Sequence, residues 1–408
     1  MFALLKLAWR NIWRNKRRTF ITVGSIMFAL FFAIIMRAFQ IGSYGKMKEN
    51  AVESYSGYFQ IHKKGYWNDK NINAVFSMSA DTIAKLSLNP KIKVIIPRLE
   101  SFSLASSGNI SKGVVVMGID PEKENKMTKI KTYLKKGSFL NSKDKNEILV
   151  ASDLAKFLKV SVKDTLVLYS SGYHGSTAAG LFKIKGILKL PVPEMNRSTL
   201  YMPLTVSQTF FSTGNQVTGL IFDLHSIDDT SIVEQTISKQ INLKKYEIID
   251  WQIMNKDLLQ MIASDNAGGL IMIAILYLVI AFGIFGTVLM MTTERIREFS
   301  VMIAIGMQKS KLILVVIWEL IFITFLAVFA GIMLSSPVLI YFYYNPIQFT
   351  GETVQAMKNF NFEPVMPVGI NTNLFVYQSL VIVFISVLAM LYPVLKIKML
   401  KVVEGLKS

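Results

Sequence analysis

The sequence lacks cysteine and is poor in histidine and acidic residues. Of its 408 residues none is Cys, three are His and 27 are Asp or Glu, against 45 Lys or Arg, which gives a formal net charge of +18. Without cysteine there is no disulfide, thiolate metal site or cysteine nucleophile. The patterns G-x-x-x-x-G-K-[ST], G-x-G-x-x-G, H-E-x-x-H and G-x-S-x-G are also absent. We therefore expect no enzyme, and no cofactor or metal bound directly.

Apolar residues make up 52% of the chain and gather in four long runs. About 20 apolar residues cross the hydrocarbon core of a membrane as a helix. The predicted fold class is an α-helical integral membrane protein with four transmembrane helices and a large mixed α/β extracytoplasmic domain inserted between helices 1 and 2. The predicted spans are residues 19–41, 267–291, 312–344 and 374–395. Pro337 is expected to break the third run near its far side.

Residues 42–266, between the first two runs, have the character of a globular domain. Short β-rich runs such as Val114–Met117 alternate with helical patterns, and the segment is long enough for a core of its own. Its three histidines, His62, His174 and His225, are far apart in the sequence. Such histidines lie on a surface or in a core more often than they bind metal, so no metal site is expected.

Lysine and arginine concentrate beside the apolar runs, which indicates the orientation of the spans rather than a nucleic-acid partner. Residues 1–18, 292–311 and 396–408 contain six, four and four cations. The positive-inside rule places all three segments in the cytoplasm. Both termini are then expected in the cytoplasm, and residues 345–373 form an outer loop.

The amino-terminal segment is predicted to be an amphipathic helix in the lipid interface. Trp9 and Trp13 fall on its apolar face. Lys6, Arg10 and Arg14 recur every fourth residue on the opposite side. Tryptophan on one face and cations on the other are typical of a helix that contacts membrane lipids. The alternative is a solvated basic tail.

The segment 292–311 joins the second and third spans and is predicted to contain a short amphipathic helix at the membrane surface. At 100° per residue, its apolar and charged side chains fall on opposite faces. The apolar face has Ile296, Phe299 and Ile303, and the charged face has Glu294, Arg297 and Glu298. As the only substantial inner loop, it is the best candidate docking surface for another chain.

Glu319 is the only ionisable residue well inside the third run. A charge at the centre of a spanning helix costs roughly 2.5 to 3.5 kcal/mol on insertion scales, so it needs a partner or a polar cavity. One interpretation is a relay or coupling residue. The other, which we favour, is a hydrogen bond to a neighbouring helix or to the cationic amino-terminal helix.

Three segments resemble sequences of a known family. Residues 10–19 read RNIWRNKRRT, and residues 295–306 read RIREFSVMIAIG, similar to a coupling segment R-x-R-E-I-G-x-x-x-A-x-G. Tyr392-Pro393 with residues 402–407 resembles a closing Y-P-A…P-V-E-A-L-R, without its second proline. These are features of the MacB/FtsX superfamily of ABC transporter permeases. Arg297, Glu298, Ala304 and Gly306 match the coupling segment, whereas Phe299, Ser300 and Met302 depart from it.

The outer domain is most similar to the lipoprotein-releasing LolC/LolE branch of that superfamily. The similar segments are VVVMGIDP at 114–121, Lys136-Gly137, Glu147–Val150, and Trp251, Asn255 and Leu258. MacB itself carries a fused nucleotide-binding domain, which this sequence lacks.

The resemblance implies a permease of the bacterial inner membrane that has no nucleotide-binding site of its own. It implies pairing with a second permease chain, as a homodimer or a heterodimer, and with separate ABC ATPase subunits that bind ATP and Mg. Closure of the ATPases would push on the coupling segment, and the spans would carry the movement outward, which is mechanotransmission. The coupling residues implied are Arg295, Arg297, Glu298, Phe299, Ile303, Ala304 and Gly306.

In the lipoprotein-releasing branch the cargo is a lipid-anchored lipoprotein that passes to a periplasmic carrier. The first span offers aromatic and methionine side chains for an acyl-chain cavity, or for simple lipid contact. These are Phe28, Phe31, Phe32, Met36 and Phe39. The loop 170–180, with Tyr173 and His174, is either a carrier-contact element or a flexible hairpin tip without a role.

Three functions remain open. The leading one is release of lipoproteins. The second is MacB-like export of peptides or small toxic molecules, and the third is FtsX-like regulation of cell-wall hydrolases without transport. The lack of a fused ATPase domain weighs against the second, and the large outer domain weighs against the third.

Overall fold

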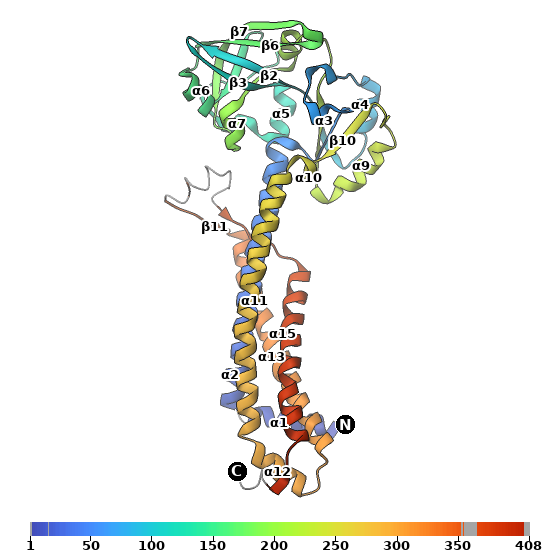
Figure 1. The fold of residues 1–408 in the computed structure, drawn as a ribbon, viewed down its shortest axis with the longest axis vertical. Helices are drawn as coiled ribbons and strands as arrows, with labels where there is room; N and C mark the ends of the chain where they lie inside the picture. The colour runs from blue at the N-terminus through green and yellow to red at the C-terminus, as the bar shows by residue number, and fades with distance from the viewer. Residues whose placement is uncertain (1, 15, 352–353, 355–364, 404–408) are drawn as a thin grey trace. The chain divides into compact units, whose positions relative to one another are not determined.

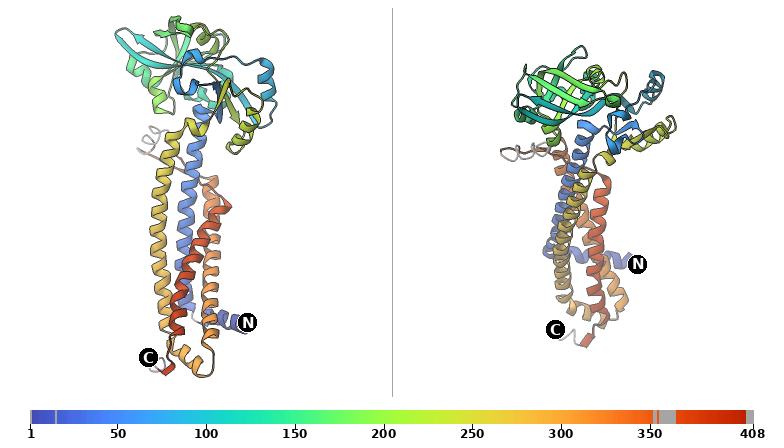
Figure 2. Two further views of the ribbon diagram at one scale, coloured as in Figure 1. Left: turned by 45° about the vertical axis from the view of Figure 1, so that its right-hand side comes forward. Right: turned by 45° about the horizontal axis from the view of Figure 1, so that its top comes forward.

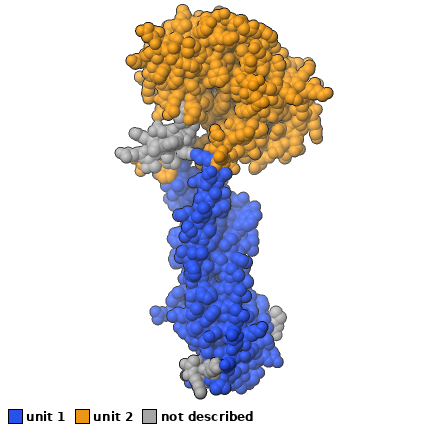
Figure 3. All heavy atoms as spheres, viewed as in Figure 1, with its two compact units in different colours: residues 1–45, 261–348, 365–408 blue, residues 46–260, 349–364 orange. Residues whose placement is uncertain are grey.

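The computed structural model describes residues 2–14, 16–351, 354 and 365–403. The chain divides into two compact units (Figure 3). The first comprises residues 1–45, 261–348 and 365–408, and the second comprises residues 46–260 and 349–364.

Helices build the first unit (Figure 1). They are α1 (Phe2–Arg14), α2 (Lys16–Ala51), α11 (Lys256–Thr293), α12 (Ile296–Ala304), α13 (Lys309–Tyr344) and α15 (Thr372–Lys398), with a small antiparallel pair of strands β11 (Ile347–Gln348) and β12 (Val365–Met366). In the described part of the chain, α2, α11, α13 and α15 are long and apolar enough to cross a membrane. The four transmembrane helices predicted from the sequence are therefore present. Helices α2 and α11 extend past the predicted limits at residues 41 and 267, and each is shared by both units.

Helix α13 does not break at Pro337, so this expectation was wrong. The helix continues through the proline to Tyr344. Proline removes one backbone donor, so the carbonyl of Met333, four residues before it, loses its helical partner, a loss that spanning helices tolerate. In the turn before the proline, the hydroxyls of Ser335 and Ser336 donate to the neighbouring carbonyl of Ile332, at 3.1 and 2.7 Å.

The second unit is the predicted mixed α/β domain, and six of its strands close into a barrel (Figure 2). Strands pair in the order β2–β3–β8–β5–β7–β6 and back to β2, while β4 pairs with β7, and β9, β1 and β10 extend the sheet from β2. The strands are β1 (Phe59–Lys63), β2 (Ile92–Ser107), β3 (Ile110–Ile119), β4 (Leu134–Gly137), β5 (Glu147–Ala151), β6 (Thr165–Ser171), β7 (Thr177–Leu188), β8 (Thr199–Pro203), β9 (Gly219–Leu224) and β10 (Tyr246–Asp250).

Alternation along the strands separates the barrel core from its outer face. Leu166 and Leu168 of β6 are buried in a core shared with β3, β5 and β7. The residues that alternate with these two along β6 face outward. Because β6 pairs with both β2 and β7, the exposed side chains of the three strands adjoin one another. This outer apolar face consists of Phe102, Leu104, Val167, Tyr169 and Leu181.

Short helices fill the connections between the strands. They are α3 (Tyr66–Asp69), α4 (Ala80–Ser87), α5 (Pro121–Thr128), α6 (Ser152–Leu158), α7 (Pro193–Ser198), α8 (Leu204–Phe210), α9 (Thr230–Ser238) and α10 (Trp251–Met254).

The G-I-D-P element at the end of β3 has a local structural reason. The Asp120 carboxylate accepts the backbone N–H groups of Glu122 and Lys123, which otherwise lack partners at the start of α5, and Pro121 fits the first helical turn. A Cβ at Gly118 would lie 1.8 Å from Ser207 Oγ, so only glycine lets α8 pack so closely on β3. The element thus turns a strand into a helix.

A buried arginine of the barrel forms an ion pair and also holds the turn that follows α2. Arg98 of β2 donates from Nε and Nη2 to the two oxygens of Glu124 in α5, at 2.8 and 2.6 Å, and both side chains are at most 4% exposed. Its Nη1 donates to the Tyr55 carbonyl at 2.6 Å, in the π-helical turn Val52–Ser56 that follows α2. Such two-point pairing is strong and directional, so it fixes this turn on the barrel.

Candidate coupling site

The short helix α12 joins α11 to α13 and ends in a glycine cap. Gly306 has a φ of +104°, which favours glycine. Its N–H donates to the Ile303 carbonyl and the N–H of Met307 donates to the Met302 carbonyl, both at 3.0 Å. These two bonds form a Schellman motif that satisfies the last carbonyls of the helix. Gly306 therefore has a structural reason to end α12.

One face of α12 is buried and the other is exposed. Phe299 is 2% exposed and Ser300 is fully buried, whereas Arg297, Val301 and Ala304 are exposed. This division follows the predicted amphipathic pattern, with Ile296 and Ile303 at the border between the two faces. The buried face holds α12 against the helical unit, and the exposed face is free for contact with another chain.

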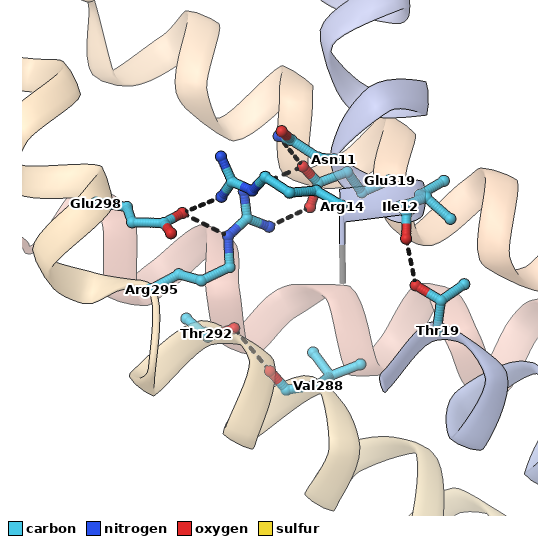
Figure 4. A network of polar contacts seen from close by, with 9 residues as sticks. All are labelled: Asn11, Ile12, Arg14, Thr19, Val288, Thr292, Arg295, Glu298 and Glu319. Carbon is cyan, nitrogen blue, oxygen red and sulfur yellow. Dashed lines mark hydrogen bonds and ion pairs between the residues drawn. The ribbon is translucent and has the colours of Figure 1, made fainter. Parts of the chain in front are cut away.

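Arg295, immediately before α12, points inward between two carboxylates (Figure 4). Its Nη1 lies 2.5 Å from Glu319 Oε2, and its Nε lies 3.3 Å from Glu298 Oε2. Only 6% of Arg295 is exposed. Burial acts to lower the pKa of Arg295, but Glu319 and then Glu298 outweigh it and raise the pKa above its usual value. The guanidinium therefore stays charged and links α12 to α13.

Glu319 uses both of its oxygens. Its Oε2 accepts from Arg295, while its Oε1 accepts from Asn11 Nδ2 of α1 at 2.5 Å and from Arg295 Nη2 at 3.3 Å. The residue is 2% exposed. A charge in this position needs such partners. The observed contacts are those of the hydrogen-bonding interpretation, and the contact with the amino-terminal helix comes from a neutral amide rather than a cation.

The structure divides the seven predicted coupling residues into two groups. Arg295 and Phe299 are buried and position α12. Arg297, Glu298, Ala304 and Gly306 are exposed, and Ile303 is half-buried. Glu298 also accepts from Arg14 Nη2 of α1 at 2.5 Å. Contact with a docked subunit therefore remains a prediction for the exposed group alone.

The five residues of α2 predicted to line an acyl-chain cavity differ in how much of each side chain is exposed. Phe28 and Phe32 are more than half exposed, whereas Phe31, Met36 and Phe39 are half-buried. Phe39 packs on Phe342 of α13 with ring centroids 5.6 Å apart. The exposed pair is accessible to lipid, and the cavity stays a prediction.

The predicted carrier-contact loop is anchored at its tip rather than extended. The backbone N–H of Tyr173 donates to the Phe211 carbonyl at 2.8 Å, and that of His174 donates to Asn73 Oδ1 at 2.7 Å. Tyr173 packs against the barrel core, whereas His174 is exposed. The flexible tip considered from the sequence is thus held in place at two points.

The histidines give no metal site among the residues that the structure describes, where no group of three potential ligands occurs. His62 is buried, its Nδ1 lies 2.6 Å from the Thr218 carbonyl oxygen, and its ring stacks on Tyr66. It is therefore a core residue of the outer domain.

Comparison with protein families extends over nearly the whole chain. The FtsX-like permease C-terminal domain matches residues 270–401, which include α12 and its glycine cap. The MacB-like periplasmic core domain matches residues 19–240, more than half of the chain. The chain belongs to the MacB/FtsX family of permeases. As a permease of this ABC-type family it is a multi-pass membrane protein, and the outer domain is the MacB-like core.

Individual relatives of this MacB/FtsX permease are distant. The lipoprotein-releasing system transmembrane protein LolE of Haemophilus influenzae is 27% identical over 142 residues, which are 33% of this chain and 34% of that protein. The alignment thus spans about a third of the relative's length. Two solved structures are similar at 14% identity. They are the periplasmic region of MacB from Actinobacillus actinomycetemcomitans (TM-score 0.36, covering 50% of this chain and 93% of that one) and the extracellular domain of the noncanonic ABC-type transporter YknZ from Gram-positive bacteria (TM-score 0.34, 47% and 99%).

Sequence reasoning missed several residues of the site in this permease. Asn11 and Arg14 of α1 contact Glu319 and Glu298, which lie 308 and 284 positions away in the chain. The amino-terminal helix had been named as one possible partner of Glu319, but its pattern did not indicate which of its residues make the contacts. The only available signal was the lone carboxylate in the third span, which required one.

Proposed function

We propose that this chain is the permease subunit of an ABC transporter that releases lipid-anchored lipoproteins from the inner membrane to a periplasmic carrier. Separate ATPase subunits bind and hydrolyse ATP with Mg, and a second permease chain completes the membrane part. The observation that carries the coupling role is α12, a capped amphipathic helix with one buried and one exposed face. The lipoprotein cargo is supported by the similarity to LolE.

The proposed orientation places α12 and both termini in the cytoplasm. Helix α12 contains Arg297, its flanks carry Arg295, Lys309 and Lys311, and the last turn of α15 carries Lys396 and Lys398. Cations near the ends of spans favour the cytoplasmic side. The MacB-like domain then lies in the periplasm.

ATPase docking is proposed on the exposed face of α12. Arg297, Val301 and Ala304 offer a cation and small or aliphatic side chains at helical spacing. Because Arg295 is fixed to Glu319 of α13, a push on this face reaches α13 through a buried ion pair rather than through a mobile loop. This is the mechanotransmission that the proposal requires.

The carrier is proposed to contact the hairpin of β6 and β7. Besides His174 at the anchored tip, this hairpin exposes Val167, Tyr169 and Leu181. Contiguous exposed apolar side chains on a soluble domain are typical of a protein-binding surface. A carrier that binds acyl chains has apolar surface to offer in return.

Depletion of the protein in its native bacterium tests the cargo. The proposal predicts that mature lipoproteins then accumulate in the inner membrane, measured by separating the two membranes and labelling lipid-modified proteins. Complementation with the wild-type chain restores sorting. Normal sorting after depletion would falsify the lipoprotein role.

A second candidate is MacB-like export of peptides or toxic molecules, which the match to the MacB-like periplasmic core domain supports. In that case depletion leaves lipoprotein sorting intact and raises sensitivity to the exported compounds. The FtsX-like role draws support from the carboxy-terminal match and predicts instead a loss of cell-wall hydrolase activity. One depletion strain with three assays separates the candidates.

A further inference from the structure

The end of α1 and the first turn of α2 contact the coupling segment through two ion pairs, one from each helix. Arg14, the last residue of α1, lies with Nη2 2.5 Å from Glu298 Oε2 in the first turn of α12. Arg18, at the start of α2, pairs with Glu294 just before α12. The junction between α1 and α2 is therefore paired with both carboxylates of the coupling segment. The chain that connects these two regions passes through α2, the whole outer domain and α11.

A third contact reaches a buried carboxylate. Asn11 of α1 shares the Glu319 carboxylate with Arg295, so one carboxylate joins α1, α13 and the start of α12. Exposed ion pairs contribute little by themselves, and Arg14 and Glu298 are each about half exposed. Hydrogen bonds to a buried charge are stronger and costly to break. The contact with the buried carboxylate therefore holds α1 in place, and the two exposed pairs fix how the α1–α2 junction faces α12.

A hydrogen bond also joins α1 directly to α2. Ala8 and Ile12 of α1 are buried against the helical unit, and Thr19 Oγ of α2 donates to the Ile12 carbonyl at 2.8 Å. Figure 4 shows this bond beside the Glu319 cluster. A displacement of α1 is thus passed to the first turn of α2.

We infer that α1 is part of the coupling unit and moves with α12, so that Arg14 and Arg18 are positioning residues that make α2 follow the coupling helix. Helices α11 and α13 are joined to α12 by short segments of chain, but α2 is not. The three contacts supply that missing connection. The inference rests on the proposed docking of an ATPase on α12.

This chain has no native cysteine, so two introduced cysteines are its only labelling sites, and the complex is assembled with partner chains from which accessible cysteines have been removed. Spin labels at Ala3→Cys in α1 and Ile305→Cys after α12 report the distance between the two helices in the permease–ATPase complex. Both native residues are exposed. We expect the same distance in the nucleotide-free and the vanadate-trapped states. A distance that changes between the two states refutes the inference.

Charge reversal then tests the contacts. Arg14→Glu with Arg18→Glu is expected to broaden the distance distribution and to make it depend on nucleotide, while the ATPase stays bound. Glu298 is left unchanged in the rescue, because it also pairs with Arg295 and an arginine at this position would repel that buried cation. Adding Glu294→Arg restores the pair with residue 18 with exchanged charges and is expected to narrow the distribution and to reduce its dependence on nucleotide. A merely structural role for the arginines predicts no dependence of the distance on nucleotide, so failure of the exchanged pair to reduce that dependence overturns the inference.

The matched control is Arg10→Glu with Arg17→Glu. Among the residues that the structure describes, neither arginine pairs with a carboxylate, and both are exposed. The control changes the net charge and the orientation signal of the segment by the same amount, and we expect wild-type distances. Equal broadening in control and test variants counts against the inference.

The milder pair Arg14→Gln with Arg18→Gln serves if the reversed chain does not assemble. It is expected to broaden the distribution less than charge reversal does, and wild-type distances in it contradict the inference. Failure of wild-type permease to retain the ATPase refutes the proposed docking, whereas retained ATPase with a moving α1 refutes only the inference.

Discussion

Arg295 and Glu319 are 24 residues apart in sequence and form a buried ion pair, with Nη1 2.5 Å from Oε2. The pair joins the residue before α12 to the eleventh residue of α13. At this point the amide of Asn11 in α1 also contacts the carboxylate. Three elements therefore meet at a single carboxylate. Loss of that charge leaves a buried guanidinium with Glu298 alone, at 3.3 Å.

Replacing Glu319 by Gln is expected to destabilise the protein by about 3 kcal/mol, because one partner of a buried pair is removed while the other stays charged. Glu319→Ala removes the acceptor for Asn11 as well and is expected to cost more. Thermal unfolding in detergent, followed by tryptophan fluorescence, measures the stability of each variant and shows which of the two loses more. Adding Arg295→Gln to Glu319→Gln is expected to recover part of the loss, and equal stability of Glu319→Gln and wild type contradicts the pair.

Gly42 of α2 is expected to tolerate no side chain. A Cβ there would lie 2.3 Å from the Pro367 carbonyl oxygen and 2.5 Å from Gly369 N, both backbone atoms. Gly42→Ala should therefore destabilise the helical unit by about 1 to 3 kcal/mol, the usual cost of forcing extra volume into a packed site.

Gly24, in the same helix, is the matched control. A Cβ at Gly24 meets nothing within 4 Å, and alanine favours a helix over glycine by about 1 kcal/mol. Gly24→Ala should thus be neutral or stabilising in the same unfolding assay. If both variants shift unfolding in the same direction, the close approach at Gly42 is not what limits the site.

The contributions of Arg98 and Glu124 to the stability of the outer domain should depend on each other. Either Arg98→Met or Glu124→Leu leaves a buried charge without its partner and is expected to cost about 3 to 5 kcal/mol. The double variant, in which both charges are gone, should cost clearly less than the two single variants together. Proteolytic sensitivity of the full-length protein and its thermal unfolding provide the double-mutant cycle, and additive losses would argue against direct pairing.

Arg297 gives the cleanest test of docking on α12. It is exposed, whereas Glu298 also pairs with Arg14 and Arg295, so a change at Glu298 disturbs two contacts besides any docking surface. Arg297→Glu is expected to weaken retention of the ATPase during purification while leaving thermal unfolding unchanged. Full retention of the ATPase by this variant contradicts docking through this face.

Hydropathy and periodicity predicted what depends on local sequence. The four apolar runs became the four long helices, and the placement of Phe299 opposite Arg297 was enough to predict the two faces of α12. The lone charge of Glu319 was enough to require a partner. These features follow from the spacing of residues along one helix.

Contacts between distant segments did not follow from the sequence. Arg295 belongs to a cationic loop and was grouped with the docking residues, yet it is buried because Glu319 attracts it inward. Nothing local distinguishes it from Arg297, which is exposed two positions later. Pro337 was also misjudged, because the helix continues through it although one backbone donor is missing.

The position of β1 between β9 and β10 limits how early the outer domain can complete its folding. Phe59 pairs with Phe222 on one side and with Asp250 on the other. A strand near the start of the domain therefore cannot complete its pairing before residues near the end of the domain are present. Long-range pairing of this kind is slow because the chain must close a large loop first. The domain therefore reaches its native state only when the residues that lead into α11 have been synthesised, and a chain truncated before Tyr246 leaves β1 with a single neighbour.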